Sequence, residues 1–375
     1  MSGCWPIPAQ EQLLLACFGA EPEASRALDA LSSSLAPGSP EPVVWGFLPL
    51  LYRRWPSAAN ELILEGRKVY LALWRQNRER MESLAALVTE FRKVGVSCLV
   101  LKGAALALRY YRDLGVRSMR DFDLLVPEKD LEAAMVGLRE MGYAAEGDYT
   151  MPAILRRARV GHAWQFFSAD GQSCDLHWRP VVRCYSPEVT RLFRDSAETA
   201  PLADITVAVL APTDQLFHVC AHGLQWDWVP PIRWIADALT VLREAIDWDR
   251  IFRLATEASM RARLASALGY LRRRFEAAVP PAILERLEHA APGWERREHR
   301  LLQKPCPLGY FDSIAWHAYN FRRLRPFDTE WRNSPVWVAF PQYLGTFLDA
   351  AGWRSLAAKG WIQVKQRASS NNGNP

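Results

Sequence analysis

The hydrophobic pattern changes its period at Gly95, and this change limits what the chain can form. From Ala58 to Lys93, apolar residues recur at spacings of three and four, which is typical of one face of a helix. After Gly95 the apolar runs are short and are stopped by glycine or proline, as strands are. The sequence therefore predicts a long helix, with Gly66 as a candidate kink, followed by a small sheet.

Residues 96–185 are predicted to form a small mixed sheet with helices packed against it. The order is strand, helix, strand, helix and hairpin, and the hairpin turn carries Asp-Gly at its centre. The strand candidates are VSCLVL, DFDLLV, HAWQFFSA and SCDLHW; the helix candidates are AALALRYYRDLG, ended by Gly115, and residues 128–141, ended by Gly142.

Helical regions are predicted on both sides of this segment, so the fold class is α+β. After Pro180 the strands are expected largely to stop, and Thr213 or Asp214 is the candidate N-cap of the next helix. Further helices are predicted over about 214–225, 231–245, 248–258 and 260–277. The predicted regions are an N-terminal helical region (1–95), a sheet-containing core (96–185), a helical domain closing its cleft (186–300), a mostly helical C-terminal extension (301–367) and a disordered tail (368–375).

Composition excludes several classes of protein. The 46 basic and 41 acidic residues give a net charge of +5, without the basic stripe of a duplex-binding domain. Stable nucleic-acid binding is therefore not expected, although a triphosphate is permitted. The seven cysteines are scattered and contain no CxxC pair, which predicts reduced thiols in a cytoplasmic protein and no zinc ribbon. No apolar run is long enough for a membrane span.

Asp121 and Asp123 form an Asp-x-Asp pair in the second predicted strand. Residues i and i+2 of a strand share a face, so both carboxylates project together while Phe122 points into the core. Adjacent carboxylates repel each other, and a bound divalent cation offsets that cost. We therefore predict a metal site here. Arg117 and Arg120 precede the pair, and Arg117 is the stronger candidate for a phosphate contact.

Two flanking features strengthen the prediction of a metal–triphosphate site. Lys102 and Gly103 lie where a strand turns into a helix, and free backbone N–H groups at a helix start favour phosphate. In SCDLHW, alternation places Asp175 and His177 on one face, so a third carboxylate can reach the first two from a neighbouring strand. Three carboxylates can hold two metal ions that activate a hydroxyl and steady a triphosphate.

These residues resemble the uncharacterised nucleotidyltransferase family of the DNA polymerase β superfamily. The resemblance is carried by LVLKGAALALRYYRDLGVRSMRDFDLLVPEKDLEAAMVGLREMGY followed by CDLHWRP, and more weakly by DQLFHVCAHGLQWDWVPPIRWIADALTVLREAIDWDRI. Better-known superfamily members carry Gly-Ser where this chain has Lys102-Gly103-Ala104. The resemblance implies a nucleotidyltransferase core at residues 96–185.

The resemblance also implies an activity. We expect Mg²⁺- or Mn²⁺-dependent transfer of a nucleotidyl group from ATP or another nucleoside triphosphate to an acceptor hydroxyl, with release of pyrophosphate. Asp121, Asp123 and Asp175 are the expected catalytic residues and metal ligands. The acceptor stays open among protein, peptide, sugar and small molecule. The other residues expected to bind the nucleotide are Lys102, Gly103, Arg117, His177, His222, Arg233 and Asp237.

Other functions stay open on the sequence alone. A glycosyltransferase can use Asp-x-Asp to hold a nucleotide sugar, although the helical first 95 residues do not fit such a fold. A non-catalytic, antitoxin-like nucleotide-binding module is a further alternative. His218 and His222 have zinc-binding spacing but lack the glutamate of HExxH, so a structural role is favoured. YNFRRLRPF could contact a single strand or a membrane, and a packed helix with a charged outer face is favoured.

Overall fold

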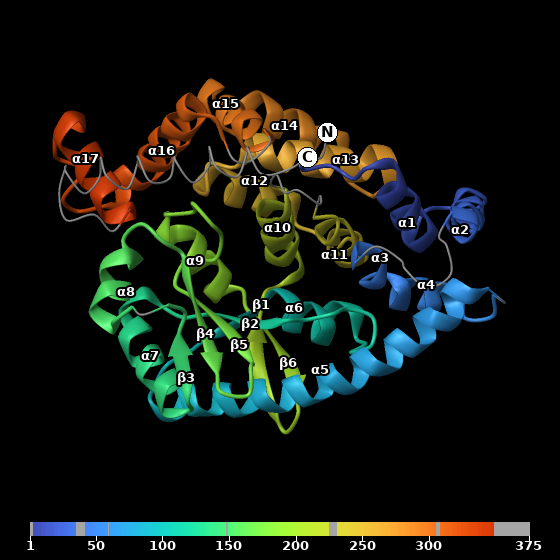
Figure 1. Ribbon diagram of the computed structural model, residues 1–375. Coiled ribbons are helices and arrows are strands. Elements are labelled where there is room, and N and C mark those ends of the chain that lie inside the picture. Colours follow the sequence, from blue (N-terminus) through green and yellow to red (C-terminus); the bar gives the residue numbers. More distant parts are fainter. Residues whose placement is uncertain are drawn as a thin grey trace, which may run out of the picture.

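A mixed seven-stranded sheet lies at the centre of the protein, with helices on either side of it (Figure 1). The computed structural model describes residues 3–34, 42–58, 60–147, 149–224, 231–304 and 308–348. The order of the strands is β3-β4-β5-β2-β1-β7-β6. The strands are β1 (Leu99–Leu101), β2 (Asp121–Leu125), β3 (Tyr143–Ala145), β4 (Ala163–Ser168), β5 (Ser173–His177), β6 (Glu198–Leu202) and β7 (Ile205–Val209). The α+β class is confirmed.

The sheet extends further along the chain than expected. We expected strands largely to stop after Pro180, whereas β6 and β7 form a hairpin and β7 pairs in parallel with β1. The sequence signal was weak because β6 contains Pro201 and the turn between the strands contains no glycine. Ala203, at φ +49°, makes that turn instead. The four strands predicted before Pro180 are confirmed, and β3 was not anticipated.

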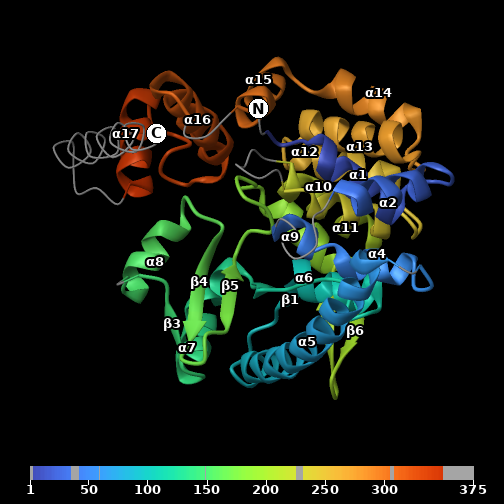
Figure 2. The ribbon, with the colours of Figure 1, turned by 45° about the vertical axis from the view of Figure 1, so that its right-hand side comes forward.

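The N-terminal helices end in one long helix that runs along the sheet. In both views this helix, α5, lies on the opposite side of the sheet from the C-terminal helices (Figure 2). Its apolar stripe packs on the sheet, with Leu84, Leu87 and Phe91 fully buried. The helices of this region are α1 (Pro8–Phe18), α2 (Glu23–Ser34), α3 (Pro42–Trp45), α4 (Leu48–Arg54) and α5 (Glu61–Lys93).

α5 is not split at Gly66. The helix is continuous, and a Cβ atom at Gly66 would lie 2.5 Å from the carbonyl oxygen of Leu48. The glycine therefore lets α4 approach the helix backbone closely, which no side chain would permit. Asn60 begins the helix by accepting a hydrogen bond from the backbone N–H of Ile63 at 3.1 Å.

Short helices connect the strands and cover the sheet. The segment after β1 forms α6 (Lys102–Ala105) and continues as a π-helix, Leu106–Tyr111, which ends at Arg112 in the left-handed region. The helix predicted over 128–141 is present as a 3₁₀ turn followed by α7, and Gly142 follows it at φ +82°. The remaining helices here are α7 (Leu131–Glu140), α8 (Met151–Ala158) and α9 (Pro187–Asp195).

The C-terminal helices stack on the opposite side of the sheet from α5 (Figure 1). The first four confirm the helices predicted after Pro180, but the predicted N-cap was wrong. Ala211 is the N-cap of α10; Thr213 instead accepts from the Asp247 backbone, and Asp214 pairs with Arg250. These helices are α10 (Pro212–Gly223), α11 (Arg233–Val241), α12 (Trp248–Glu257), α13 (Arg261–Phe275), α14 (Pro281–Ala290), α15 (Gly293–Leu302), α16 (Tyr310–Leu324) and α17 (Val336–Phe347).

α16 and α17 lie at one end of the molecule, where α17 contacts α8 (Figure 2). Arg159, directly after α8, joins the two parts through ion pairs to Asp328 and Glu330. The predicted tail, residues 368–375, lies outside the described residues. Within the part of the chain that the structure describes, no helix combines the length and apolar character needed to cross a bilayer.

Candidate active site

Two neighbouring parallel strands place the predicted carboxylates side by side. β2 and β5 pair in a register that sets Asp121 opposite Ser173, Asp123 opposite Asp175 and Leu125 opposite His177. Because alternate residues share a face, Asp121, Asp123, Asp175 and His177 project to the same side of the sheet. Phe122 is buried in the core on the other side, as predicted.

Asp123, Asp175 and His177 form a compact group that could hold a metal ion. One ligand atom from each lies within 4.8 Å of the others. Asp123 and His177 are each 1% exposed, and Nε2 of His177 lies 3.0 Å from Oδ1 of Asp123. Asp175 Oδ1 and His177 Nδ1 are buried without a hydrogen-bond partner among the described residues. Buried polar atoms are normally satisfied, so these two fit a site that takes a ligand.

Asp121 lies at the edge of this group. It occupies the same face one step earlier on β2, is partly exposed, and is not among the three residues that converge. Burial raises the pKa of Asp121, and the neighbouring Asp123 carboxylate adds to the increase. The same two causes raise the pKa of Asp175. Desolvation and mutual repulsion therefore destabilise the ionised form of both carboxylates. A bound divalent cation would offset this cost.

Lys102 is the counter-charge closest to the carboxylates. Its Nζ lies 2.5 Å from Oδ1 of Asp123, across the antiparallel β1–β2 pair. Burial alone would raise the pKa of Asp123, but the His177 hydrogen bond and the Lys102 ammonium outweigh it and hold that pKa well below its usual range. Asp123 is therefore ionised, as a metal ligand must be.

Gly103 lets the loop before β2 pack closely against the start of α6. A Cβ atom there would lie 2.8 Å from Nη1 of Arg117 and 2.9 Å from Cγ of Met119. This loop therefore lies directly against Gly103 in the structure. Lys102 adopts φ +43°, a conformation rare for a residue with a side chain. Strained backbone of this kind clusters at functional sites.

Arg117 and Asp237 form a bidentate pair that joins the core to α11. Nε and Nη2 of Arg117 each lie 2.9 Å from an oxygen of Asp237, whose Oδ1 also accepts from the Tyr111 hydroxyl at 3.0 Å. Arg233 donates to the carbonyl oxygen of Ser118 at 2.8 Å. These predicted nucleotide-binding residues therefore also hold the loop before β2 against the helical region.

His222 stacks on His218 of the same helix, with ring centroids 6.0 Å apart. His218 contacts the carbonyl oxygen of Pro180 through Nε2 at 2.9 Å. Burial lowers the pKa of His218 to about 3 and that of His222 well below its usual range, so both rings are neutral. His218 has the structural contact that the sequence favoured.

The sequence did not single out two residues that support the site. Asn77 of α5 is fully buried and donates to the carbonyl oxygens of Leu114 at 2.6 Å and Arg117 at 2.8 Å, which positions the loop before β2. His162 packs edge-on against His177, and burial lowers its pKa to about 3. A polar Asn within the apolar stripe of α5 was the one available signal.

Comparison with known proteins identifies a family for this chain. A search of curated proteins found no match. The model of the family described as "Uncharacterised nucleotidyltransferase" matches residues 46–276, which is more than half of the chain and runs from the residue after α3 to the residue after α13. The matched segment contains the whole sheet and every residue of the carboxylate group. The chain therefore belongs to the uncharacterised nucleotidyltransferase family.

Proposed function

We propose that this protein transfers a nucleotidyl group from a nucleoside triphosphate, with Mg²⁺ or Mn²⁺, to the hydroxyl group of a peptide, sugar or other small acceptor. The observation that carries the proposal is the convergence of Asp123, Asp175 and His177, with two buried atoms left unpartnered, on a sheet of this family. The carboxylate oxygens of Asp123 and Asp175 are the kind of ligand that Mg²⁺ and Mn²⁺ prefer.

Asp123 and Asp175 would hold the cation, with Asp121 as the outer ligand on the same face. When bound, the ion lowers the pKa of a hydroxyl and neutralises charge on the triphosphate. His177 orients Asp123 through the 3.0 Å contact between them. Asp123 is the central member of this group because both Lys102 and His177 contact its Oδ1.

The chain's own residues account for the movement of charge. The acceptor oxygen forms a bond to the α-phosphorus, the bond from that phosphorus to the bridging oxygen breaks, and pyrophosphate leaves with its electron pair. Asp175 takes the hydroxyl proton. Lys102 exchanges its contact with Asp123 for the triphosphate, at the start of α6 where Gly103 lies.

The residues of the helical region form the wall of the nucleotide site in this proposal. Arg117, Arg233 and Asp237 connect α11 to the loop before β2, and His222 lies behind them on α10. Asp237 holds Arg117 in one orientation through Nε and Nη2, which fixes the direction of the N–H donors on Nη1. A fixed guanidinium loses little entropy when it binds phosphate.

The test is transfer of label from a panel of α-labelled nucleoside triphosphates. The purified chain is incubated with Mg²⁺ or Mn²⁺ and a host-cell extract, and retained label and released pyrophosphate are both measured. Asp123→Asn and Asp175→Asn are expected to abolish both signals. Asp204→Asn, which changes an exposed carboxylate in the β6–β7 turn, is the matched control and should retain them.

Labelling that survives both active-site substitutions would refute the proposed site. Absence of labelling together with metal-dependent transfer from nucleotide sugars would replace nucleotidyl transfer by glycosyl transfer at the same carboxylates. Nucleotide binding without any turnover in the wild-type protein would support a non-catalytic module instead.

A further inference from the structure

A cavity lies in the C-terminal part of the molecule. It has a volume of about 840 Å³ and is lined by residues of α15, α16 and α17, by the segment between α16 and α17, and by Ser259. This volume is that of a pocket for one small organic molecule. All the lining residues except Ser259 lie beyond residue 276, where the family match ends. The cavity is therefore an addition to the nucleotidyltransferase core.

The lining of this cavity is strongly positive. It includes Arg322, Arg323, Arg325 and Arg332, and no aspartate or glutamate is among the described lining residues. The acidic groups near it already have partners: Asp328 and Glu330 both pair with Arg159. Arg325 donates to two backbone carbonyl oxygens rather than to a carboxylate. The cavity thus has cationic groups that an anion would neutralise.

Aromatic rings supply most of the remaining lining. They are Trp294, Tyr319, Phe321, Phe327 and Phe340. Arg322 lies over the ring of Trp294, with its guanidinium carbon 4.9 Å from the centroid. Phe327 is 48% exposed, although large aromatic side chains are usually covered in a folded protein. These surfaces suit a flat, apolar ligand body, and the arginines suit an anionic group attached to it.

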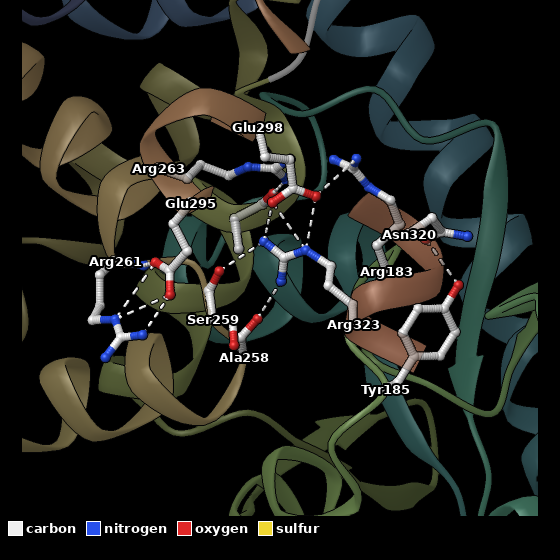
Figure 3. A network of polar contacts seen from close by, with 11 residues as sticks. Arg183, Tyr185, Ala258, Ser259, Arg261, Arg263, Glu295, Glu298, Asn320 and Arg323 are labelled. Atoms are coloured by element: carbon white, nitrogen blue, oxygen red, sulfur yellow. Dashed lines mark hydrogen bonds and ion pairs between the residues drawn. The ribbon is translucent and has the colours of Figure 1, made fainter. Parts of the chain in front are cut away.

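The wall of the cavity is held rigid by a buried polar network behind it (Figure 3). Arg323, 9% exposed, donates to both oxygens of Glu298 and to the carbonyl oxygens of Ala258 and Ser259, each carbonyl at 2.7 Å. Arg183 shares the same Glu298, at 3.3 Å. Because one carboxylate serves two guanidinium groups, positive charge is left in excess beside the cavity.

We propose that this cavity binds a small anionic molecule with a planar aromatic body, such as an aromatic carboxylate, sulfonate or phosphate. The rings contact the body, and Arg322 and Arg332 bind the anionic group at the mouth. Arg323 adds positive potential from the wall without giving up Glu298. The proposal does not depend on the nucleotidyl-transfer activity, because none of the lining residues belongs to the carboxylate site.

The test uses the fluorescent dye 1-anilinonaphthalene-8-sulfonate, which has the proposed chemistry. Its neutral counterpart, N-phenyl-1-naphthylamine, has the same rings without the sulfonate. Divalent ions are omitted to keep nucleotide from binding at the carboxylates. We expect one sulfonate dye to bind per chain and the neutral dye to bind more weakly by about tenfold or more.

The variant Arg322→Gln, Arg332→Gln removes two exposed charges at the cavity, and Arg67→Gln, Arg75→Gln removes two exposed charges on α5 as the matched control. The first is expected to raise the dissociation constant of the sulfonate dye at least about tenfold, and the second to leave it unchanged. Equal unfolding midpoints for the three proteins show that the dye does not report partial unfolding.

Equal dye affinity in the cavity variant and the wild type would overturn the proposal, as would no dye binding or equal binding of the neutral dye. Displacement by 2-naphthoate or by thymidine 5′-monophosphate supports it and distinguishes a simple aromatic acid from a nucleotide as the source of the anion. An oligothymidylate that competes far more tightly than the monophosphate would instead show an extended nucleic-acid site.

Discussion

The carboxylate group on β2 and β5 and the guanidinium group behind the C-terminal cavity bury charge of opposite sign. Among the described residues, Lys102 is the one lysine or arginine that forms an ion pair with the carboxylate group, through Asp123. In the second region Arg183, Arg263 and Arg323 surround the carboxylate of Glu298.

The excess of like charge in each region shifts the pKa values of its buried groups. Burial and Asp123 raise the pKa of Asp175, while burial and Arg183 lower the pKa of Arg263 to about 9. On the two proposals made above, a cation at the sheet and an anion at the cavity would each offset part of this imbalance.

The largest effect is expected from Glu298→Gln. This change removes the carboxylate that neutralises Arg183 and Arg323 in a site that is 2% exposed, and it leaves their charges buried and unpaired. The free energy of unfolding should fall by about 3–5 kcal/mol, measured by urea denaturation. Glu285→Gln, an exposed residue of α14, is the control and should change it by less than about 0.5 kcal/mol. A loss as small as the control's would show that the arginines are neutralised by other means.

An intermediate effect is expected from adding a divalent cation. Mn²⁺ that binds the folded chain at a concentration of 100 times its dissociation constant should stabilise it by about 2.7 kcal/mol, seen as a higher melting temperature that a chelator reverses. Asp123→Asn should remove this stabilisation and Asp204→Asn should retain it. Stabilisation that persists in Asp123→Asn would place the ion elsewhere.

The smallest change in stability is expected from Asp175→Asn, and its sign is opposite to that expected for Glu298→Gln. Without metal, Asp175→Asn should raise the urea midpoint at pH 7, because the substitution removes a carboxylate whose ionised form is disfavoured by burial and Asp123. The raised pKa of the folded state means that the wild type loses stability as pH rises through that pKa. The difference between variant and wild type should therefore shrink as pH falls below about 3.9, the pKa of an unfolded aspartate. A lower urea midpoint in Asp175→Asn would contradict this difference, because both regions would then lose stability when a carboxylate is replaced by an amide.

Much of the fold followed from local patterns. The stripe on α5, the alternation in DFDLLV and SCDLHW, and the glycine after α7 depend on neighbours a few residues away, and the structure has each of them. The β6–β7 hairpin was missed because its strands contain Pro201 and its turn lacks glycine, so the local signal was weak. The close contact of Gly66 was not anticipated because its partner, Leu48, lies on another helix.

In the candidate site, too, some features follow from the local sequence and others depend on tertiary contacts. The sequence by itself determined that Asp121 and Asp123 share a face and that Asp175 and His177 share another, because a strand has a period of two. Only the tertiary structure decided that these faces meet in register, that Lys102 contacts Asp123, and that Asp237 holds Arg117. The last pair is separated by 120 residues. Such contacts depend on packing across the whole chain, which no local period encodes.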